Sequence, residues 1–174
     1  MAIYLHYYSQ AKARSRLLMF QDNQLEGVLS FSTFANASSL TYLDLSSNRF
    51  HGNLPPLLFS SQSKIETFDV SDNQLEGVLS FSTFANASSL TYLDLSSNRF
   101  HGNLPPLLFS SQSKIETFDV SDNQLEGVLS FSTFANASSL TYLDLSSNRF
   151  HGNLPPLLFS TKARSRLLMF RTIN

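Results

Sequence analysis

A row of aspartates at constant spacing is the feature of this sequence best suited to chemistry. An aspartate with an apolar residue on each side recurs once every 25 residues. The members of the row are Asp44, Asp69, Asp94, Asp119 and Asp144. On stacked strands, neighbouring carboxylates would lie about 5 Å apart and repel by ~3 kcal/mol at an effective dielectric constant of about 20. Such a row therefore needs hydroxyl donors, a cation or partial protonation.

Two interpretations of the row stay open. In the structural one, the serines two positions further along the chain donate hydrogen bonds to the carboxylates, and the row serves the fold. In the functional one, the row is the floor of an acidic, tyrosine-edged groove that binds a basic or hydroxyl-rich peptide. Calcium is poorly specified, because Ca²⁺ takes six to eight converging oxygen ligands. We predict no metal and no cofactor.

Further polar columns run beside the aspartates, with one residue from each repeat. We expect these columns and the aspartates to form one concave binding face. The predicted ligand-binding residues are Tyr42, Asp44, Ser46, Arg49, Thr67, Asp69, Ser71, Asp72, Tyr92, Asp94, Ser96, Arg99, Thr117, Asp119, Ser121, Asp122, Tyr142, Asp144 and Arg149.

The spacing of the histidines argues against a catalytic site. His51, His101 and His151 recur every 50 residues, which puts neighbours roughly 10 Å apart on a stack of strands, too far for a shared metal or an acid–base pair. The chain has 0 Cys, which removes disulfides, thiol catalysis and cysteine metal sites. No phosphate-binding loop, dinucleotide motif or nucleophile elbow is present. We predict no catalytic residue.

The elements that position these residues are internal repeats. Residues 22–110 reappear unchanged as residues 72–160. The halves 40–64 and 65–89 share apolar residues at their first, fourth and sixth places, an asparagine at the ninth and a glycine at the thirteenth. The repeat unit is therefore 25 residues long, and stacked units of this kind form a solenoid.

Each unit has the pattern of a half-buried strand followed by a turn. Leu43, Asp44 and Leu45 alternate apolar and polar, which predicts a strand. A buried asparagine after the strand is expected to bond backbone groups of adjacent coils; these are Asn23, Asn48, Asn73, Asn98, Asn123 and Asn148. Core side chains are predicted at Phe50, Leu54, Phe59, Phe81 and Phe84.

This pattern resembles the leucine-rich repeat, L-x-x-L-x-L-x-x-N-x-L. The run from Asn48 to Pro55 is similar to the plant-specific extracellular subtype of receptor-like kinases and receptor-like proteins, although Ser80 replaces the proline which that subtype prefers. The resemblance implies an α/β-type repeat solenoid, a right-handed coil with a parallel β-sheet on the concave face and mostly loops and short 3-10 turns on the convex face. It also implies a non-catalytic role in binding a protein or peptide. The cysteine-paired caps usual in such proteins are absent.

The predicted organisation is an N-terminal tail or improvised cap at 1–17, a solenoid at 18–160 and a degraded terminal repeat at 161–174. Residues 12–20 recur unchanged as 162–170, and both segments are basic. They are either improvised caps that keep the ends from stacking or leftovers of duplication. Nucleic acid is not a predicted partner, because three charges without an aromatic platform give only salt-sensitive contact.

Localisation stays open. Sequons for N-glycosylation occur at Asn36, Asn86 and Asn136 and indicate extracellular ancestry, but residues 1–8 are too polar for a secretion signal and no run is long enough for a membrane span. Three functions remain: a scaffold that binds a protein or peptide, an idealised or duplicated array without a specific ligand, and a protein that self-associates through its ends.

Overall fold

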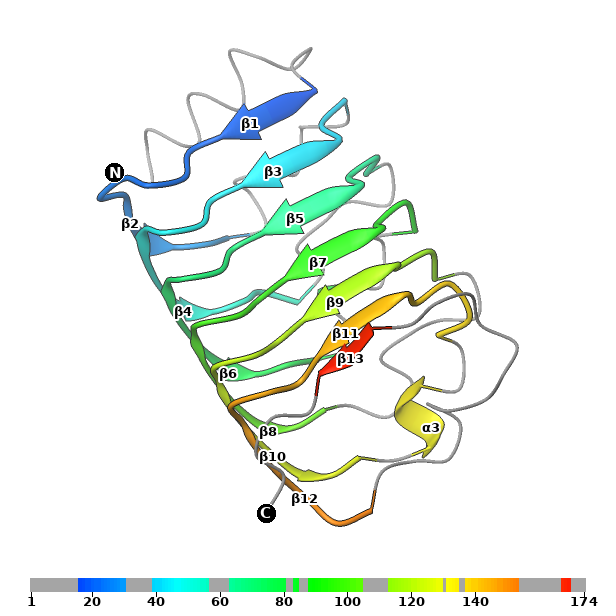
Figure 1. Ribbon diagram of the computed structural model, residues 1–174. Coiled ribbons are helices and arrows are strands. Elements are labelled where there is room, and N and C mark those ends of the chain that lie inside the picture. Colours follow the sequence, from blue (N-terminus) through cyan, green and yellow to red (C-terminus); the bar gives the residue numbers. More distant parts are fainter. Residues whose placement is uncertain are drawn as a thin grey trace.

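A computed structural model describes most of the repeat region and parts of its ends. The described residues are 16–30, 39–56, 63–80, 83–84, 88–104, 113–129, 131–134, 137–153 and 167–169. They form a solenoid in which each coil contributes one short strand to a first sheet and, in most coils, one strand to a second sheet (Figure 1).

The first sheet confirms the predicted parallel sheet. It has seven strands in the order β1-β3-β5-β7-β9-β11-β13. All of its pairs are parallel and in the register of the 25-residue repeat, with Tyr42 beside Thr67 and Asp44 beside Asp69. Its strands are β1 (Leu17–Met19), β3 (Tyr42–Asp44), β5 (Thr67–Asp69), β7 (Tyr92–Asp94), β9 (Thr117–Asp119), β11 (Tyr142–Asp144) and β13 (Leu167–Met169).

The second sheet is a feature that the sequence analysis missed. It has six parallel strands, and Figure 1 shows it meeting the first sheet along one side of the solenoid. In β4, Phe50 points into the core while Arg49 and His51 are exposed, so the segment read as a turn is a half-buried strand. The strands are β2 (Glu26–Val28), β4 (Arg49–Asn53), β6 (Gln74–Val78), β8 (Arg99–Asn103), β10 (Gln124–Val128) and β12 (Arg149–His151).

Little helix is seen in the described part of the chain. The α-helix there is α3 (Phe131–Phe134), one turn long. Most of the connections predicted as loops and 3-10 turns lie outside the described residues, as do Phe59 and Phe81. The predicted end segments 1–17 and 161–174 also lie mostly outside them, so their role as caps stays a prediction.

The core is one continuous column of side chains between the two sheets. Leu43 and Phe68 from the first sheet and Leu75 from the second are 0% exposed, and Phe50 is 1% exposed. The partly buried Leu54 and Phe84 pack against this column. Because every coil buries its apolar face only against the coils beside it, stability depends on stacking.

An asparagine ladder joins the coils. The Asn98 side-chain nitrogen donates to the carbonyls of Val70 (2.9 Å), Leu95 (3.2 Å) and Ser96 (2.9 Å). Its side-chain oxygen accepts the N–H of Leu75 at 2.9 Å, so one amide bonds its own coil and the coil before it. The predicted role is confirmed for five of the six asparagines, because the equivalent bonds recur at Asn48, Asn73, Asn123 and Asn148. Asn23 differs: it is exposed, and within the described residues it bonds carbonyls of its own coil.

Replacing Asn98 by alanine should strongly destabilise the fold. The change leaves the Leu75 N–H unpaired in the interior and removes one of the two asparagine donors to the Val70 carbonyl. The stranded N–H costs about 1–3 kcal/mol and the lost hydrogen bond about 1 kcal/mol more. We expect urea unfolding to show a loss of roughly 2–4 kcal/mol. Gln124→Ala, an exposed change on β10, is the matched control. Equal midpoints for the two variants would contradict the ladder's structural role.

Candidate functional site

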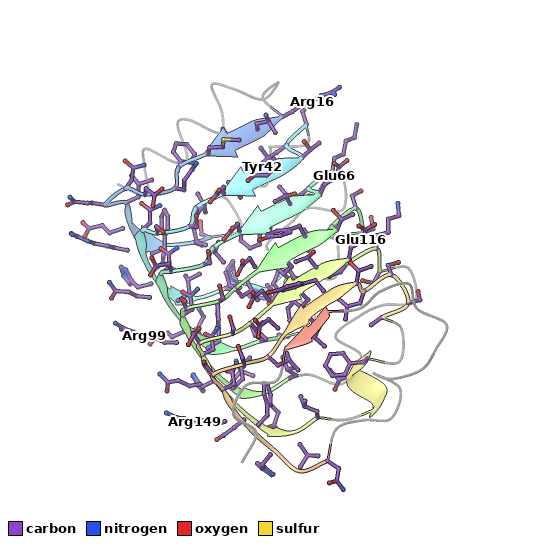
Figure 2. All side chains as sticks on the ribbon, in the orientation of Figure 1. Arg16, Tyr42, Glu66, Arg99, Glu116 and Arg149 are labelled. Carbon is purple, nitrogen blue, oxygen red and sulfur yellow. The ribbon has the colours of Figure 1, made fainter. Side chains whose placement is uncertain are left out.

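The exposed face of the first sheet carries the predicted tyrosine, threonine and aspartate columns. In the strands β1 to β11 of this sheet the middle residue is buried, as Leu43 is in β3, and its two neighbours lie on the opposite face. Figure 2 shows Tyr42 on this sheet. The sheet therefore places Tyr42, Thr67, Tyr92, Thr117 and Tyr142 in one column and the five aspartates in the next.

The serine donors expected from the sequence are present. Asp44 Oδ1 accepts the Ser46 N–H at 3.0 Å and the Ser46 hydroxyl at 2.6 Å. The pairs at Asp69 and Asp94 repeat both bonds, and Asp119 and Asp144 accept the equivalent backbone N–H. One oxygen of each carboxylate thus closes a turn after its strand. This geometry supports the structural interpretation of the row.

The aspartate row is also partly withdrawn from solvent. Asp44 and Asp144 are 9% and 7% exposed, and the three between them are half-buried. The pKa of Asp69 is raised to about 6: burial is the largest cause, hydrogen bonds from Ser71 oppose it, and the charges of Asp94 and Asp44 add to it. Burial likewise raises the pKa of Asp119. Asp69 can therefore hold a proton in mildly acidic solution.

Tyrosines donate to the second carboxylate oxygens. The Tyr92 hydroxyl donates to Asp94 Oδ2 at 3.2 Å, and that of Tyr142 lies 3.4 Å from Oδ2 of both Asp119 and Asp144. Burial and the nearby carboxylates raise the pKa of Tyr92 and raise that of Tyr142 to about 12. Burial and the charge of Asp44 likewise raise the pKa of Tyr42. The tyrosines are thus neutral donors at physiological pH.

The remaining predicted residues do not all join this face. Asp72 and Asp122 are exposed in the turn after the strand, with backbone φ of 50° and 52°, and Ser47 donates to Asp72 Oδ2 at 3.2 Å. Arg49, Arg99 and Arg149 each begin a strand of the second sheet. Figure 2 shows Arg99 and Arg149 projecting from that sheet, away from Tyr42. The structure therefore divides the predicted set between two surfaces.

Two features of this face went unnoticed in the sequence. Leu17 and Met19 on β1 are 55% and 54% exposed and stand beside Tyr42 and Asp44, so an apolar pair ends both columns. The sequence signal for this pair was that the segment Leu17–Met19 lies in register with the strand positions of the repeats. A polar cavity of about 440 Å³ also lies where the first strands begin, lined by Arg16, Ser39, Thr41, Lys64, Glu66 and Ser89.

Within the described residues, no group of three or more His, Cys, Asp or Glu side chains could hold a metal ion. None of the helices described there is long and apolar enough to cross a membrane. The sequons at Asn36, Asn86 and Asn136 lie outside the described residues.

Comparison with known families decides the classification. The family model for the leucine-rich repeat matches residues 38–100 and 88–150, which together are more than half of the chain. The chain belongs to the leucine-rich repeat family. No curated protein sequence matches it.

Solved structures of plant leucine-rich repeat proteins share this fold. The Arabidopsis receptor kinase HAESA, in complex with the peptide hormone IDA and the co-receptor SERK1, is 27% identical with a TM-score of 0.75, over 92% of this chain and 26% of HAESA. A TDR receptor is 29% identical with a TM-score of 0.70, over 95% of this chain and 32% of its own.

A third similar structure is a plant ice-binding protein. It is 29% identical with a TM-score of 0.74, over 90% of this chain and 48% of its own. The chain therefore spans between about a quarter and a half of the length of these proteins. The likeness establishes a leucine-rich repeat protein that resembles plant receptor ectodomains.

The raised carboxyl pKa values predict how stability depends on pH. A carboxyl group has a pKa near 3.9 when unfolded, and that of Asp69 is about 6 when folded. The folded state then binds more protons between these values, so stability falls as pH rises from about 4 to 6. Asp69→Asn keeps an acceptor for Ser71 and should flatten this slope in urea titrations.

The exposed Asp122→Asn is the control and should leave the slope unchanged. A wild-type protein whose unfolding midpoint rises steadily from pH 4 to pH 7, unaltered by Asp69→Asn, would contradict this electrostatic description of the row.

Proposed function

We propose that this chain is a non-catalytic scaffold that binds an extended protein or peptide segment across the strands of the first sheet. The observation that carries the proposal is the face itself, in which the parallel strands from β1 to β11 present side chains in columns. Similar structures support it: HAESA binds the peptide hormone IDA, and the plant peptide hormone receptor RGFR1, 25% identical, binds RGF2.

The chemistry of the face favours a basic, hydroxyl-rich segment. The five aspartates occupy adjacent strands, so the row is about 19 Å long at ~4.8 Å per strand. About six residues of extended chain cover that length at ~3.3 Å each. Cationic side chains of the ligand would relieve the repulsion between the carboxylates, and its hydroxyls could donate to oxygens that the tyrosines leave free.

The N-terminal end of the face adds an apolar contact. Leu17 and Met19 hold the positions of the tyrosine and aspartate columns at the first strand and are more than half exposed. A ligand with an apolar side chain at one end and basic residues after it would match this order. Because the columns are nearly uniform, neighbouring registers offer almost the same contacts, so we expect low sequence specificity.

Neutralising the centre of the row should weaken binding of a basic peptide. We expect a fluorescent peptide of alternating lysine and serine, followed by anisotropy at low salt and pH 7.5, to bind Asp94→Asn/Asp119→Asn about tenfold more weakly than the wild type, which corresponds to ~1.4 kcal/mol. Asparagine retains an acceptor for Ser96 and Ser121, so the turns should survive.

Glu76→Gln/Glu126→Gln is the matched control, because it removes two exposed carboxylates from the second sheet. Equal weakening by both double variants would indicate charge attraction without a defined face. Absence of binding by the wild type would favour a repeat array without a ligand of this class.

A further inference from the structure

At the C-terminal end of the second sheet, some strand positions have no partner among the described residues. The inner strands β4 and β8 are five residues long, and in β4 residues His51, Gly52 and Asn53 pair with the following strand, β6. The last strand, β12, has only three residues and pairs within the described region with β10 alone. Residues 151–153 are the repeat equivalents of 51–53, and within the described region no following strand pairs with them.

The N-terminal end lacks the opposite half of this pairing. The inner strands β6 and β10 are five residues long, and in β6 residues Gln74, Leu75 and Glu76 pair with the preceding strand, β4. The first strand, β2, has three residues and pairs in the described region with β4 only. The equivalents of Gln74–Glu76 are residues 24–26, and they have the same sequence.

The two ends therefore carry the two complementary segments that pair with each other between the inner strands β4 and β6. Residues 151–153 are His-Gly-Asn, as are 51–53, and residues 24–26 are Gln-Leu-Glu, as are 74–76. Pairing 151–153 of one copy with 24–26 of another reproduces the register between β4 and β6. Unpaired edges of this kind recruit further strands.

The asparagine ladder is open at the same two places. Asn23 is exposed, and its side-chain nitrogen donates to the Phe20 and Gln21 carbonyls of its own coil and, among the described residues, to no other coil. Among the described residues, no N–H donates to the Asn23 side-chain oxygen. At the other end, the N–H groups of Phe50 and Phe100 each donate to an asparagine of the next coil, at 2.9 Å.

Phe150 has no such partner in the described part of the chain, and the repeat period puts Ile173 where that asparagine would stand. Within the described residues, an asparagine side-chain oxygen without a donor thus lies at one end of the solenoid, and a backbone N–H without an asparagine acceptor lies at the other.

The first sheet completes the match. Residues 162–170 repeat 12–20 without a change. As a result, β13 stands beside β11 in the register that β1 has beside β3, with Leu167 next to Tyr142 and Leu17 next to Tyr42. The β1 segment of a second copy therefore fits the position beside β11 with the same side chains.

We propose that this chain self-associates head to tail, with the N-terminal coil of one copy continuing the solenoid of another. The incoming β1 takes the place of β13 beside β11, the incoming β2 pairs with β12, and Asn23 accepts the Phe150 N–H. Phe20 and Leu25, which are partly exposed although their counterparts Leu45 and Phe50 are buried, become covered. Because the contact is heterologous and does not close, it forms chains of copies.

Disulfide trapping tests the register, since the chain has 0 Cys. In the proposed contact, Leu17 of one copy stands beside Tyr142 of another, on strands about 4.8 Å apart, within the reach of a disulfide. We expect a mixture of Leu17→Cys and Tyr142→Cys chains to form a mixed disulfide-linked dimer under mild oxidation. Thr67→Cys in place of Leu17→Cys lies inside the sheet and should form none.

A mixed disulfide between Leu17→Cys and Leu167→Cys, with none to Tyr142→Cys, would overturn the proposed exchange, because it would place the incoming strand on β13. Equal trapping by Thr67→Cys would overturn the register, because it would indicate random collision.

Light scattering across a hundredfold range of concentration tests the association itself. We expect the wild-type mass to rise with concentration, and Asn23→Ala to need about fivefold more protein for the same mass, as for one lost hydrogen bond. Gln21→Ala, on the same turn, should behave as the wild type. Ile173→Asn should also reduce association, because it supplies the missing asparagine within the chain. A wild type that stays monomeric throughout would refute the proposal.

Discussion

The structure depends on one buried amide in each coil. An inner asparagine such as Asn98 receives an N–H from the coil before it and donates to carbonyls of both coils, satisfying backbone groups that the turn leaves unpaired. A turn without this amide would strand polar groups between two sheets. Because the bond joins neighbouring coils, it fixes their spacing and hence the columns on both faces. It also needs the coil before its own, and no such coil lies among the described residues at Asn23.

The candidate binding face is a consequence of that spacing. Stacking places five aspartates on adjacent strands and half-buries Asp69 and Asp119, which opposes the ionisation of these two and raises the pKa of Asp69 to about 6. Serine and tyrosine donors offset part of this cost. Local hydrogen bonds therefore stabilise this surface, but no positive charge on the face compensates the repulsion between the described carboxylates. A basic ligand would complete it, which links the energetics of the row to the proposed function.

Much of this was predictable, because the repeat period carries both structure and position. The strand around Leu43, the core at Phe50 and the role of Asn98 follow from alternation and from the need to pair buried backbone groups. The second sheet was not predicted, because Gly52 was interpreted as part of a turn. In the structure Gly52 has a φ of 78° but lies within the strand β4. Arg99 was assigned to the wrong face for a related reason: one period governs every column, so spacing alone cannot say which sheet a column belongs to.

Asparagine side chains hydrogen-bond neighbouring coils to one another, and in the last described coil of the second sheet the Phe150 N–H lacks this bond among the described residues. Amide hydrogen exchange on protein labelled with ¹⁵N at phenylalanine tests it directly, with single Phe→Leu substitutions to assign the signals. The account predicts that Phe50 and Phe100 exchange only on global unfolding, whereas Phe150 exchanges faster in dilute protein and slows as concentration rises. Rapid exchange at Phe100, equal to that at Phe150, would contradict it.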